Sequence, residues 1–289
     1  MLSGAAHLNV GRLHFWKYQS IGNDFPIVHI ADLPPADDQF LNRLAVEICD
    51  RRFGVGGDGL LAVHRVADGL VLLRMFNPDG TEDFCGNGLR CAAVHARAQS
   101  WVGDSFSIDH LGRRVLVEIG DGFVRTEIGS ASLRPSDVPV NTEDAELYLK
   151  PIFWESGHTI TGTAITTGST HVVIPVDRLP DDAEFFESGP KIENFEIYPE
   201  RTSVIWTQEV APNHLAIRIW ERGVGETLGC GTGSSAAAAN YLRGKDSGGR
   251  VQVDNRGGSL VVEMDSWDAP ITVEGVAEQT YTGEYILRT

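Results

Sequence analysis

The chain has 289 residues, of which 42% are hydrophobic and 22% charged, and it carries a formal net charge of −16. This length and composition are typical of a soluble globular protein with one large or two medium domains. The negative charge disfavours nucleic acids and anionic membranes as partners, because it repels phosphate, and no apolar run approaches the roughly 20 residues of a membrane span.

The N-terminus and the cysteine content together suggest where the protein works. Residues 1–15 lack the basic and apolar segments of a secretion signal. Four cysteines in a chain of this length are too few for a disulfide scaffold. We therefore expect a cytoplasmic protein whose thiols are free for chemistry.

The first half predicts alternating helices and strands. It predicts a helix at residues 40–53 and then a buried strand at 71–76, which is closed by a turn at 77–80. A second helix at 86–99 and another strand at 115–119 follow. Asp37 or Asp38 would be the N-cap of the first helix. Prolines and acidic residues cluster at 133–144, which indicates a domain boundary there.

The second half repeats this order. Residues 183–199 form a polar segment, which we expect at the surface. The sequence then predicts a strand at residues 215–222, a helix at 231–243 and a strand at 260–264. Gly244 would end the helix as its C′ residue. A last strand-like segment at residues 281–287 could belong to either half.

A repeated motif connects the two halves. Residues 85–93 read CGNGLRCAA and residues 230–238 read CGTGSSAAA, so Cys85 and Cys230 are 145 residues apart. The same offset pairs further residues: Gly80 with Gly225, Asp109 with Asp254, Gly112 with Gly257, Val117 with Val262 and Glu118 with Glu263. A gap-free match of this length indicates two related halves, each one supersecondary unit.

Each repeated cysteine precedes a predicted helix. The unpaired N–H groups and the positive end of the helix dipole lower the pKa of a nearby thiol and bind anions such as carboxylates. If the halves face each other, the two cysteines converge on one small site. One thiolate could then remove an α-proton while the other thiol delivers a proton to the opposite face. Cys49 and Cys91, on apolar helical faces, are expected in the core.

No cofactor or metal is expected. The four lysines lie outside any loop that suggests a pyridoxal site, and the spacing of Cys85 and Cys91 does not suit zinc. The string Gly54-x-Gly56-x-x-Gly59 follows a predicted helix instead of a strand, which argues against dinucleotide binding.

Several segments in this order resemble the diaminopimelate epimerase family. They span nearly the whole chain and comprise residues 22–25 (GNDF), 53–59 (FGVGGDG), 76–80 (FNPDG), 85–88 (CGNG), 221–227 (ERGVGET) and 230–233 (CGTG). The resemblance implies an α/β fold of two pseudo-symmetric lobes, each a curled sheet around a central helix. The lobes would span residues 1–133 and 134–277, with a C-terminal strand at 278–289 returning to the first lobe.

The resemblance also implies a role for each matching residue. Cys85 and Cys230 would be the acid/base pair, supported by His171 and Glu221. The reacting carboxylate would be held by Gly86, Asn87, Gly231 and Thr232. The distal end of the substrate would be reached by Asn23, Asn77 and Arg222. The implied reaction converts LL- to meso-2,6-diaminopimelate without pyridoxal phosphate, in the formation of lysine and peptidoglycan precursors.

Two positions depart from the family pattern. Ser169 and Ser203 stand where asparagines usually belong to the distal recognition set. Serine is shorter, so a direct bond to the substrate becomes water-mediated or is lost. This leaves a second hypothesis, a related two-cysteine racemase for another amino acid, and a third, a ligand-binding or thiol redox protein on the same scaffold. In each case we expect a small-molecule ligand and allow for a homodimer.

Overall fold

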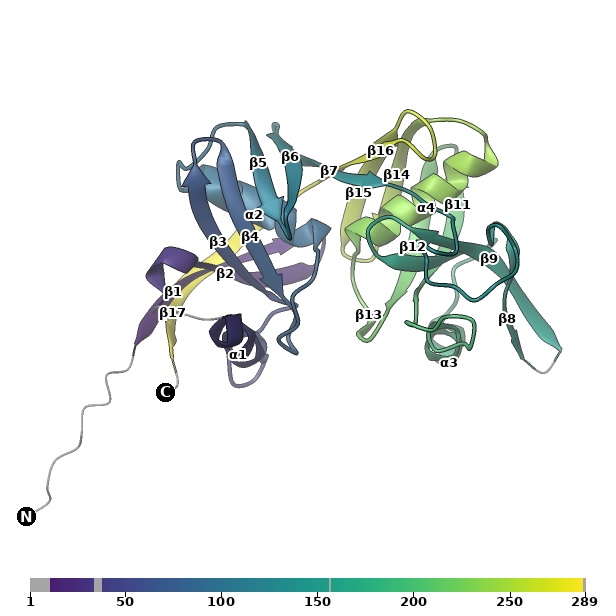
Figure 1. Cartoon of the computed structure of the whole chain (residues 1–289), viewed down its shortest axis with the longest axis horizontal. Coiled ribbons are helices and arrows are strands. Elements are labelled where there is room, and N and C mark those ends of the chain that lie inside the picture. The colour runs from purple at the N-terminus through teal and green to yellow at the C-terminus, as the bar shows by residue number, and fades with distance from the viewer. Residues whose placement is uncertain (1–10, 34–37, 156, 288–289) are drawn as a thin grey trace, which may run out of the picture.

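The computed structural model describes residues 11–33, 38–155 and 157–287, which form two lobes of mixed α/β structure (Figure 1). The N-terminal lobe contains β1 (Arg12–Ser20), β2 (Asn23–His29), a 3-10 turn (Ile30–Asp32), α1 (Asp38–Cys49), β3 (Leu60–Ala67), β4 (Leu70–Phe76), α2 (Gly86–Ala98), β5 (Ser105–His110), β6 (Arg113–Ile119), β7 (Val124–Ser130) and β17 (Glu278–Ile286). The C-terminal lobe contains β8 (Lys150–Glu155), β9 (His158–Thr166), β10 (Thr170–Pro175), α3 (Asp182–Glu193), β11 (Ser203–Ala211), β12 (His214–Glu221), β13 (Gly225–Glu226), α4 (Gly231–Gly244), β14 (Gly249–Asn255), β15 (Gly258–Met264) and β16 (Pro270–Gly275).

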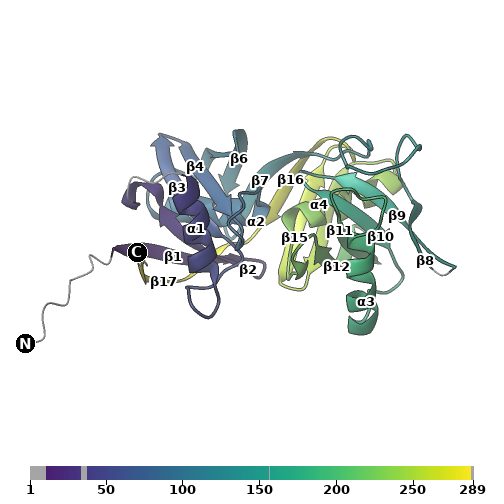
Figure 2. The ribbon, with the colours of Figure 1, turned by 60° about the horizontal axis from the view of Figure 1, so that its bottom comes forward.

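The strands of both lobes follow one hydrogen-bonded path. In the N-terminal lobe the order is β17-β1-β2-β3-β4-β5-β6-β7. In the C-terminal lobe it is β16-β15-β14-β12-β11-β10-β9-β8. An antiparallel pairing of β7 with β16 joins the lobes, and both strands cross between them in Figure 2.

The repeat in the sequence is a repeat in the structure. The series β4, α2, β5, β6, β7 recurs as β12, α4, β14, β15, β16. In both copies the helix connects two parallel neighbouring strands, β4 with β5 and β12 with β14. The predicted fold of two related α/β lobes is therefore confirmed, and each copy is a βαβ unit followed by two antiparallel strands.

Each central helix is surrounded by its sheet. The small side chains of residues 234–239 in α4 are fully buried, and the helix contacts β9–β12 and β14–β16. Helix α2 is buried along Gly86–Ala93 and contacts β1–β4, β6, β7 and β17. Small residues allow strands to approach a helix on every side, which explains how both helix N-termini come to lie deep in the molecule.

The other two long helices cover the opposite sheet faces. On β3, Leu61 and Val63 pack with α2, whereas Leu60 and Ala62 belong to the cluster under α1. Helix α3 packs on β11 and β12 in the same way. The alternation follows from the two-residue period of a strand. In each lobe the central helix α2 or α4 therefore lies inside the curled sheet, and α1 or α3 covers its outer face.

Three sequence-based predictions about helices need correction. Residues 183–199 were expected only to be surface, but they contain most of α3, which buries Phe185, Gly189 and Ile192. Helix α1 ends at Cys49, not at residue 53, because the Asp50 carboxylate accepts the N–H groups of residues 52 and 53 at 2.7 Å and turns the chain. Gly244 is the last residue of α4, and Lys245 is the C-cap. The Asp37 cap lies outside the described residues.

The strand near the C-terminus, β17, pairs antiparallel with β1 of the N-terminal lobe. It follows β16 directly, so the chain leaves the C-terminal lobe at Gly275 and returns to the other lobe (Figure 1). The division at residues 133 and 134 stays a prediction. Within residues 11–33, 38–155 and 157–287, no helix combines the length and apolarity that crossing a bilayer requires.

Candidate active site

The helix N-termini that follow the repeated motif meet where the lobes join. Cys85 is the N-cap of α2 and Cys230 the N-cap of α4, with φ/ψ angles of −134°/110° and −136°/121°. A Cβ atom built on Gly86 would lie 3.9 Å from Cα of Gly231, so the two backbones almost touch. The structure therefore brings the two repeated motifs together, as the sequence predicted.

Both thiols cap their own helix. The Cys85 sulfur accepts the N–H of Gly88 at 3.3 Å, and the Cys230 sulfur accepts the N–H of Gly233 at 3.4 Å. These bonds take the place that a serine or aspartate oxygen takes in an ordinary N-cap. Each sulfur thus sits beside a positive helix end, in equivalent positions of the two lobes.

Burial nevertheless opposes ionisation of both thiols. Desolvation raises the pKa of Cys85 to about 11 and also raises the pKa of Cys230 above its ordinary value. The bonds from Gly88 and Gly233 lower both pKa values without offsetting the burial, and the nearby Glu221 raises them further. The helix ends therefore lower the pKa of both thiols, as expected, but the cost of burying a charge is larger and the net shift is upward.

Glu221 ends β12 next to the Cys230 thiol. Its carboxylate accepts a hydrogen bond from Thr227 Oγ1, and its charge raises the pKa of the Cys230 thiol. Burial raises the pKa of Glu221 above its usual range, with a further rise from the charges of Asp58 and Asp83. A carboxylate that lies near a thiol and holds its own proton more tightly than usual is suited to accept that thiol's proton.

A chain of hydrogen bonds joins His171 to the same sulfur. His171 Nε2 lies 3.0 Å from Ser169 Oγ, which lies 3.1 Å from Thr232 Oγ1, and this oxygen lies 3.3 Å from Cys230 Sγ. Burial lowers the pKa of His171 to about 3, with a further contribution from the charge of Arg222. The imidazole is therefore neutral at pH 7, and its Nε2 either donates to or accepts from Ser169 Oγ according to the tautomer, while Nδ1 is buried without a recorded hydrogen-bond partner among the described residues.

The main chain of each cysteine is held by residues at equivalent positions. Cys85 N–H donates to His110 Nε2 at 3.1 Å, and Cys230 N–H donates to Asn255 Oδ1 at 3.3 Å. His110 and Asn255 are separated by the same 145 residues as the cysteines. His110 Nδ1 lies 3.2 Å from the Leu73 carbonyl, and burial lowers the pKa of His110 to about 4, so its ring is neutral and Nε2 is the acceptor.

Asn87 connects the two lobes beside the cysteines. Its Nδ2 donates to the Gly229 carbonyl at 3.0 Å, immediately before Cys230, and also to Asn23 Oδ1. Its Oδ1 accepts a hydrogen bond from Arg90. Asn87 is only 2% exposed, so its side chain is a fixed structural bridge between the α2 N-terminus and the loop before α4.

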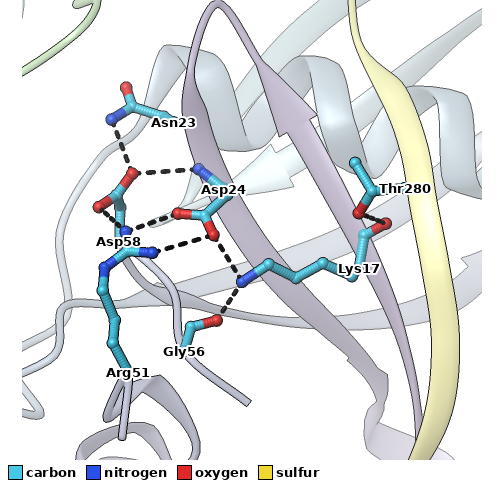
Figure 3. Close-up of polar contacts among 7 residues, drawn as sticks. All are labelled: Lys17, Asn23, Asp24, Arg51, Gly56, Asp58 and Thr280. Carbon is cyan, nitrogen blue, oxygen red and sulfur yellow. Dashed lines mark hydrogen bonds and ion pairs between the residues drawn. The ribbon is translucent and has the colours of Figure 1, made fainter.

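Asn23 is fixed in turn by a network of charges (Figure 3). Asn23 Nδ2 donates to Asp58 at 3.1 Å, and Arg51 pairs with both Asp58 and Asp24 at 2.7 Å. Lys17 is buried and pairs with Asp24 at 2.8 Å. These bonds hold β1, β2 and the loop before β3 together and orient the Asn23 amide.

The remaining residues of the distal set are engaged within the protein. Asn77 Nδ2 donates to Thr81 Oγ1 at 3.1 Å within its turn. Ser203 is 6% exposed, and its hydroxyl accepts the N–H of Arg222 at 3.1 Å. Arg222 Nη1 donates to the Glu200 carbonyl at 3.2 Å. Ser169 and Ser203 thus both use their hydroxyl groups to support other residues of the predicted site.

Sequence reasoning missed Arg90, His110 and Asn255. The last two could have been found from the 145-residue offset, since they lie between residues already matched by it. Arg90 lies inside the first motif but has no counterpart in the second, where Ser235 stands. The expected core positions of Cys49 and Cys91 are confirmed, since both are at most 3% exposed.

The residues of the site differ in exposure: Cys85, Asn23 and Glu221 are half-buried, and Cys230 is buried. Two surface cavities of about 260 and 430 Å³ lie beside Val176 and Asp177, and none of the predicted site residues lines either one. Among the described residues, no group of three or more His, Cys, Asp or Glu side chains could hold a metal ion.

Sequence comparison decides the family. A family model described as diaminopimelate epimerase matches residues 15–134 and 163–281. The chain belongs to the diaminopimelate epimerase family. It is 35% identical to the diaminopimelate epimerase of Pelotomaculum thermopropionicum over 285 residues, which covers 96% of this chain and 100% of that protein. It is also 35% identical to the chloroplastic diaminopimelate epimerase of Oryza sativa subsp. japonica, over 95% of this chain and 80% of that protein.

Solved structures show the same fold at lower identity. A hydroxyproline epimerase from Agrobacterium vitis superimposes with a TM-score of 0.67 at 12% identity and covers 94% of this chain and 90% of its own. A phenazine biosynthesis protein of the PhzF family from Bacillus anthracis gives 0.66 at 19% identity and covers 96% of this chain and 100% of its own. The two-lobed architecture is therefore common to a hydroxyproline epimerase and a phenazine biosynthesis protein, and fold alone does not choose between functions.

Proposed function

We propose that this member of the diaminopimelate epimerase family interconverts LL- and meso-2,6-diaminopimelate by moving one α-proton between Cys85 and Cys230. The observation that carries the proposal is the pair of cysteine N-caps on two helix ends whose first glycines almost touch. The curated relatives named diaminopimelate epimerase match along nearly the whole chain, which supports this substrate. The reaction belongs to the formation of lysine and peptidoglycan precursors.

The substrate carboxylate would bind between the two helix ends. The N–H groups of Gly86, Asn87, Gly231 and Thr232 lie in the first turns of α2 and α4, where anions are stabilised. The same groups stabilise the charge that spreads onto the carboxylate when the α-proton leaves.

The proton then moves in two steps that balance. The thiolate of one cysteine takes the α-proton and becomes a thiol, and the electron pair stays on the substrate carbon and its carboxylate. The thiol of the other cysteine gives its proton to the opposite face and becomes a thiolate. The direction of the reaction decides which cysteine starts as the base.

Glu221 and His171 would manage the charge state of Cys230. Glu221 would accept the thiol proton of Cys230, and the rise of its own pKa by burial makes it a stronger base for this step than an ordinary carboxylate. His171 acts at longer range through Ser169 and Thr232. The residues that we assign to the chemistry supply both acid and base, so the proposed mechanism uses no cofactor.

The distal end of the substrate is the place where a second function could arise. Asn23, Asn77 and Arg222 would reach it, but the hydroxyl groups of Ser169 and Ser203 are bonded to protein groups. Because both hydroxyl groups are bonded within the protein, a racemase for a different amino acid is the second candidate function. The choice is made by testing diaminopimelate beside a panel of L-amino acids.

Exchange in D₂O tests the reaction and its mechanism together. The protein is incubated under reducing conditions with LL-diaminopimelate, and the α-protons are followed by NMR. A two-base mechanism places deuterium in the meso product before it appears in the remaining substrate. Absence of exchange with diaminopimelate, together with exchange of another amino acid, would replace the first proposal by the second.

Removing either thiol should stop the reaction. We expect Cys85→Ser and Cys230→Ser to lower kcat by about 10²- to 10⁴-fold, the usual contribution of a general acid or base. Cys49→Ala is the matched control, since this thiol is buried under α1 and should leave kcat unchanged. If a serine variant kept the wild-type rate, the thiol pair would have no role in the reaction.

Location and assembly are part of the same proposal. A cytoplasmic enzyme fits four free cysteines, which a reducing compartment preserves. We also propose a homodimer and a division into lobes at residues 133 and 134. Size-exclusion chromatography with light scattering distinguishes a mass near 63 kDa from the 31.5 kDa of one chain.

A further inference from the structure

One buried charge near the site has no ionic partner. Arg90 is 0% exposed, and it forms no ion pair with any residue that the structure describes. Its Nε donates to Ser20 Oγ at 3.1 Å and its Nη2 donates to Asn87 Oδ1, which are both neutral acceptors. Its third nitrogen, Nη1, is buried without any hydrogen-bond partner among the described residues. A buried guanidinium without a carboxylate is costly, so it needs an explanation.

The free nitrogen lies against the meeting point of the two helices. A Cβ atom built on Gly231 would be 3.7 Å from Arg90 Nη1 and 3.7 Å from Cα of Gly86. On its other side, a Cβ on Gly275 would be 3.0 Å from Arg90 Nε. The guanidinium therefore fills the narrow space between α2, the α4 N-terminus and the end of β16, and the contact with β16 is close enough to require glycine at position 275.

The ionisable groups whose charges act on Arg90 are thiols. They are Cys85, Cys91 and Cys230, from α2 itself and from α4. Burial lowers the pKa of Arg90 to about 10, so the guanidinium still carries its charge at pH 7. The charge of Arg90 in turn lowers the pKa of Cys85, against the larger effect of burial. Glu221, the carboxylate of the proposed site, accepts a hydrogen bond from Thr227 instead.

We propose that Arg90 is the fixed counter-charge for the anions of this site, namely the thiolates of Cys85 and Cys230 and the substrate carboxylate. This rests on the proposed function of the two thiols. Arg90 has no contact with the surface, so it is a positioning residue that acts through Asn87 and through its charge. Its missing ionic partner is supplied in the reaction cycle, when a thiolate or a carboxylate forms between the helix ends.

Thiol alkylation measures this role without any substrate. Arg90→Gln removes the charge and keeps a polar side chain, Arg90→Met is a second neutral variant, and Arg90→Lys keeps the charge. Iodoacetamide labelling of Cys85 and Cys230 at pH 8 is followed by mass spectrometry of peptides. Below the thiol pKa the labelling rate is proportional to the thiolate fraction, so a charge effect of one to three pKa units lowers it about 10- to 1,000-fold.

We expect slow labelling in both neutral variants and a rate within about threefold of wild type in Arg90→Lys. Ser20→Ala is the matched control, because it removes the partner of Nε and leaves the charge, and it should label like wild type. Circular dichroism and thermal unfolding identify which variants are folded. If Arg90→Gln does not fold, the comparison is made with Arg90→Met.

Two results would overturn the proposal. One is a folded neutral variant that labels at the wild-type rate. The other is a folded Arg90→Lys that labels as slowly as the neutral variants, which would mean that shape matters and charge does not. Kinetics add an independent readout, since loss of the counter-charge should lower kcat more than it changes KM. If wild type failed to exchange diaminopimelate but the labelling rates still followed the charge, the proposed substrate would be wrong and the role of Arg90 would stand.

Discussion

At the scale of single residues, Ser169 shows how a departure from the family pattern can acquire a new use. The resemblance implied that its shorter side chain weakens contact with the distal end of the substrate. In the structure its hydroxyl links His171 to Thr232 and so to the Cys230 sulfur. The substitution therefore changes what this position does, because a hydroxyl can donate and accept at once in a chain of hydrogen bonds.

The chain of hydrogen bonds predicts the effect of Ser169→Ala. Loss of the hydroxyl leaves His171 Nε2 without its partner, and we expect kcat to fall about tenfold, the worth of one hydrogen bond, with little change in KM. Steady-state kinetics in both directions measure this. Ser169→Asn is the informative companion, because the residue usual in the family should lower KM if a distal contact was missing. A fall in affinity alone in Ser169→Ala would show that the hydroxyl binds substrate instead.

At the scale of elements, the sequence revealed the site better than it revealed its surroundings. The repeat placed Cys85 and Cys230 before two helices, and both are the N-caps of α2 and α4. Helix α3 was missed because Pro190 and acidic residues hide its apolar face, although Asp181 and Glu184 form a capping box that marks its start. The raised pKa values of the thiols were also missed, since burial depends on how the sheets close around the helices and no local pattern encodes that.

The meeting of α2 and α4 gives a prediction about Gly231. A methyl group at this position would be 3.7 Å or more from its nearest neighbours, which is ordinary van der Waals contact. Gly231→Ala should therefore fold, with a stability equal to wild type or higher by about 0.5–1 kcal/mol, because glycine has more freedom in the unfolded chain. The added methyl occupies the space where the carboxylate would approach, so we expect KM to rise at least tenfold.

Thermal unfolding tests the expected stability of Gly231→Ala, and steady-state kinetics test the expected rise in its KM. Gly244→Ala is a control at the other end of α4, where the nearest atom to a new Cβ is the Tyr148 hydroxyl at 3.2 Å, outside the site. That variant should keep the wild-type KM. Unaltered kinetics in a folded Gly231→Ala would mean that the carboxylate binds elsewhere.

At the scale of the whole molecule, three histidines are buried in a neutral form. His95 and His110 are 0% exposed and His171 is 1% exposed. Burial lowers their pKa values to about 3, 4 and 3 respectively, below the ordinary value of 6.5. The folded state therefore excludes protons that the unfolded chain binds. This cost is distributed over both lobes, because His95 and His110 lie in the N-terminal lobe and His171 lies in the C-terminal lobe.

The sign of the resulting pH dependence follows from proton binding. Between about pH 6.5 and pH 4 the unfolded state binds up to three more protons than the folded state, so stability falls as the pH falls. Each proton contributes about 1.4 kcal/mol per pH unit, and the three together about 4 kcal/mol per pH unit in the middle of this window. Carboxylates with lowered pKa values, such as Asp24, add to the loss only near and below pH 4.

Urea unfolding at pH 7, 6 and 5 measures how the free energy of unfolding changes with pH. The variant His110→Asn removes the contribution of one histidine proton to this slope. Asparagine occupies the equivalent position 255 and accepts the cysteine N–H there, so the variant can keep its contact with Cys85. We expect the slope to fall by about one third, with little loss of stability at pH 7. His64→Asn is the control, because His64 is exposed and should leave the slope unaltered. An equal slope in wild type and His110→Asn would show that this ring is already protonated in the folded protein, and that the N–H of Cys85 must have another acceptor.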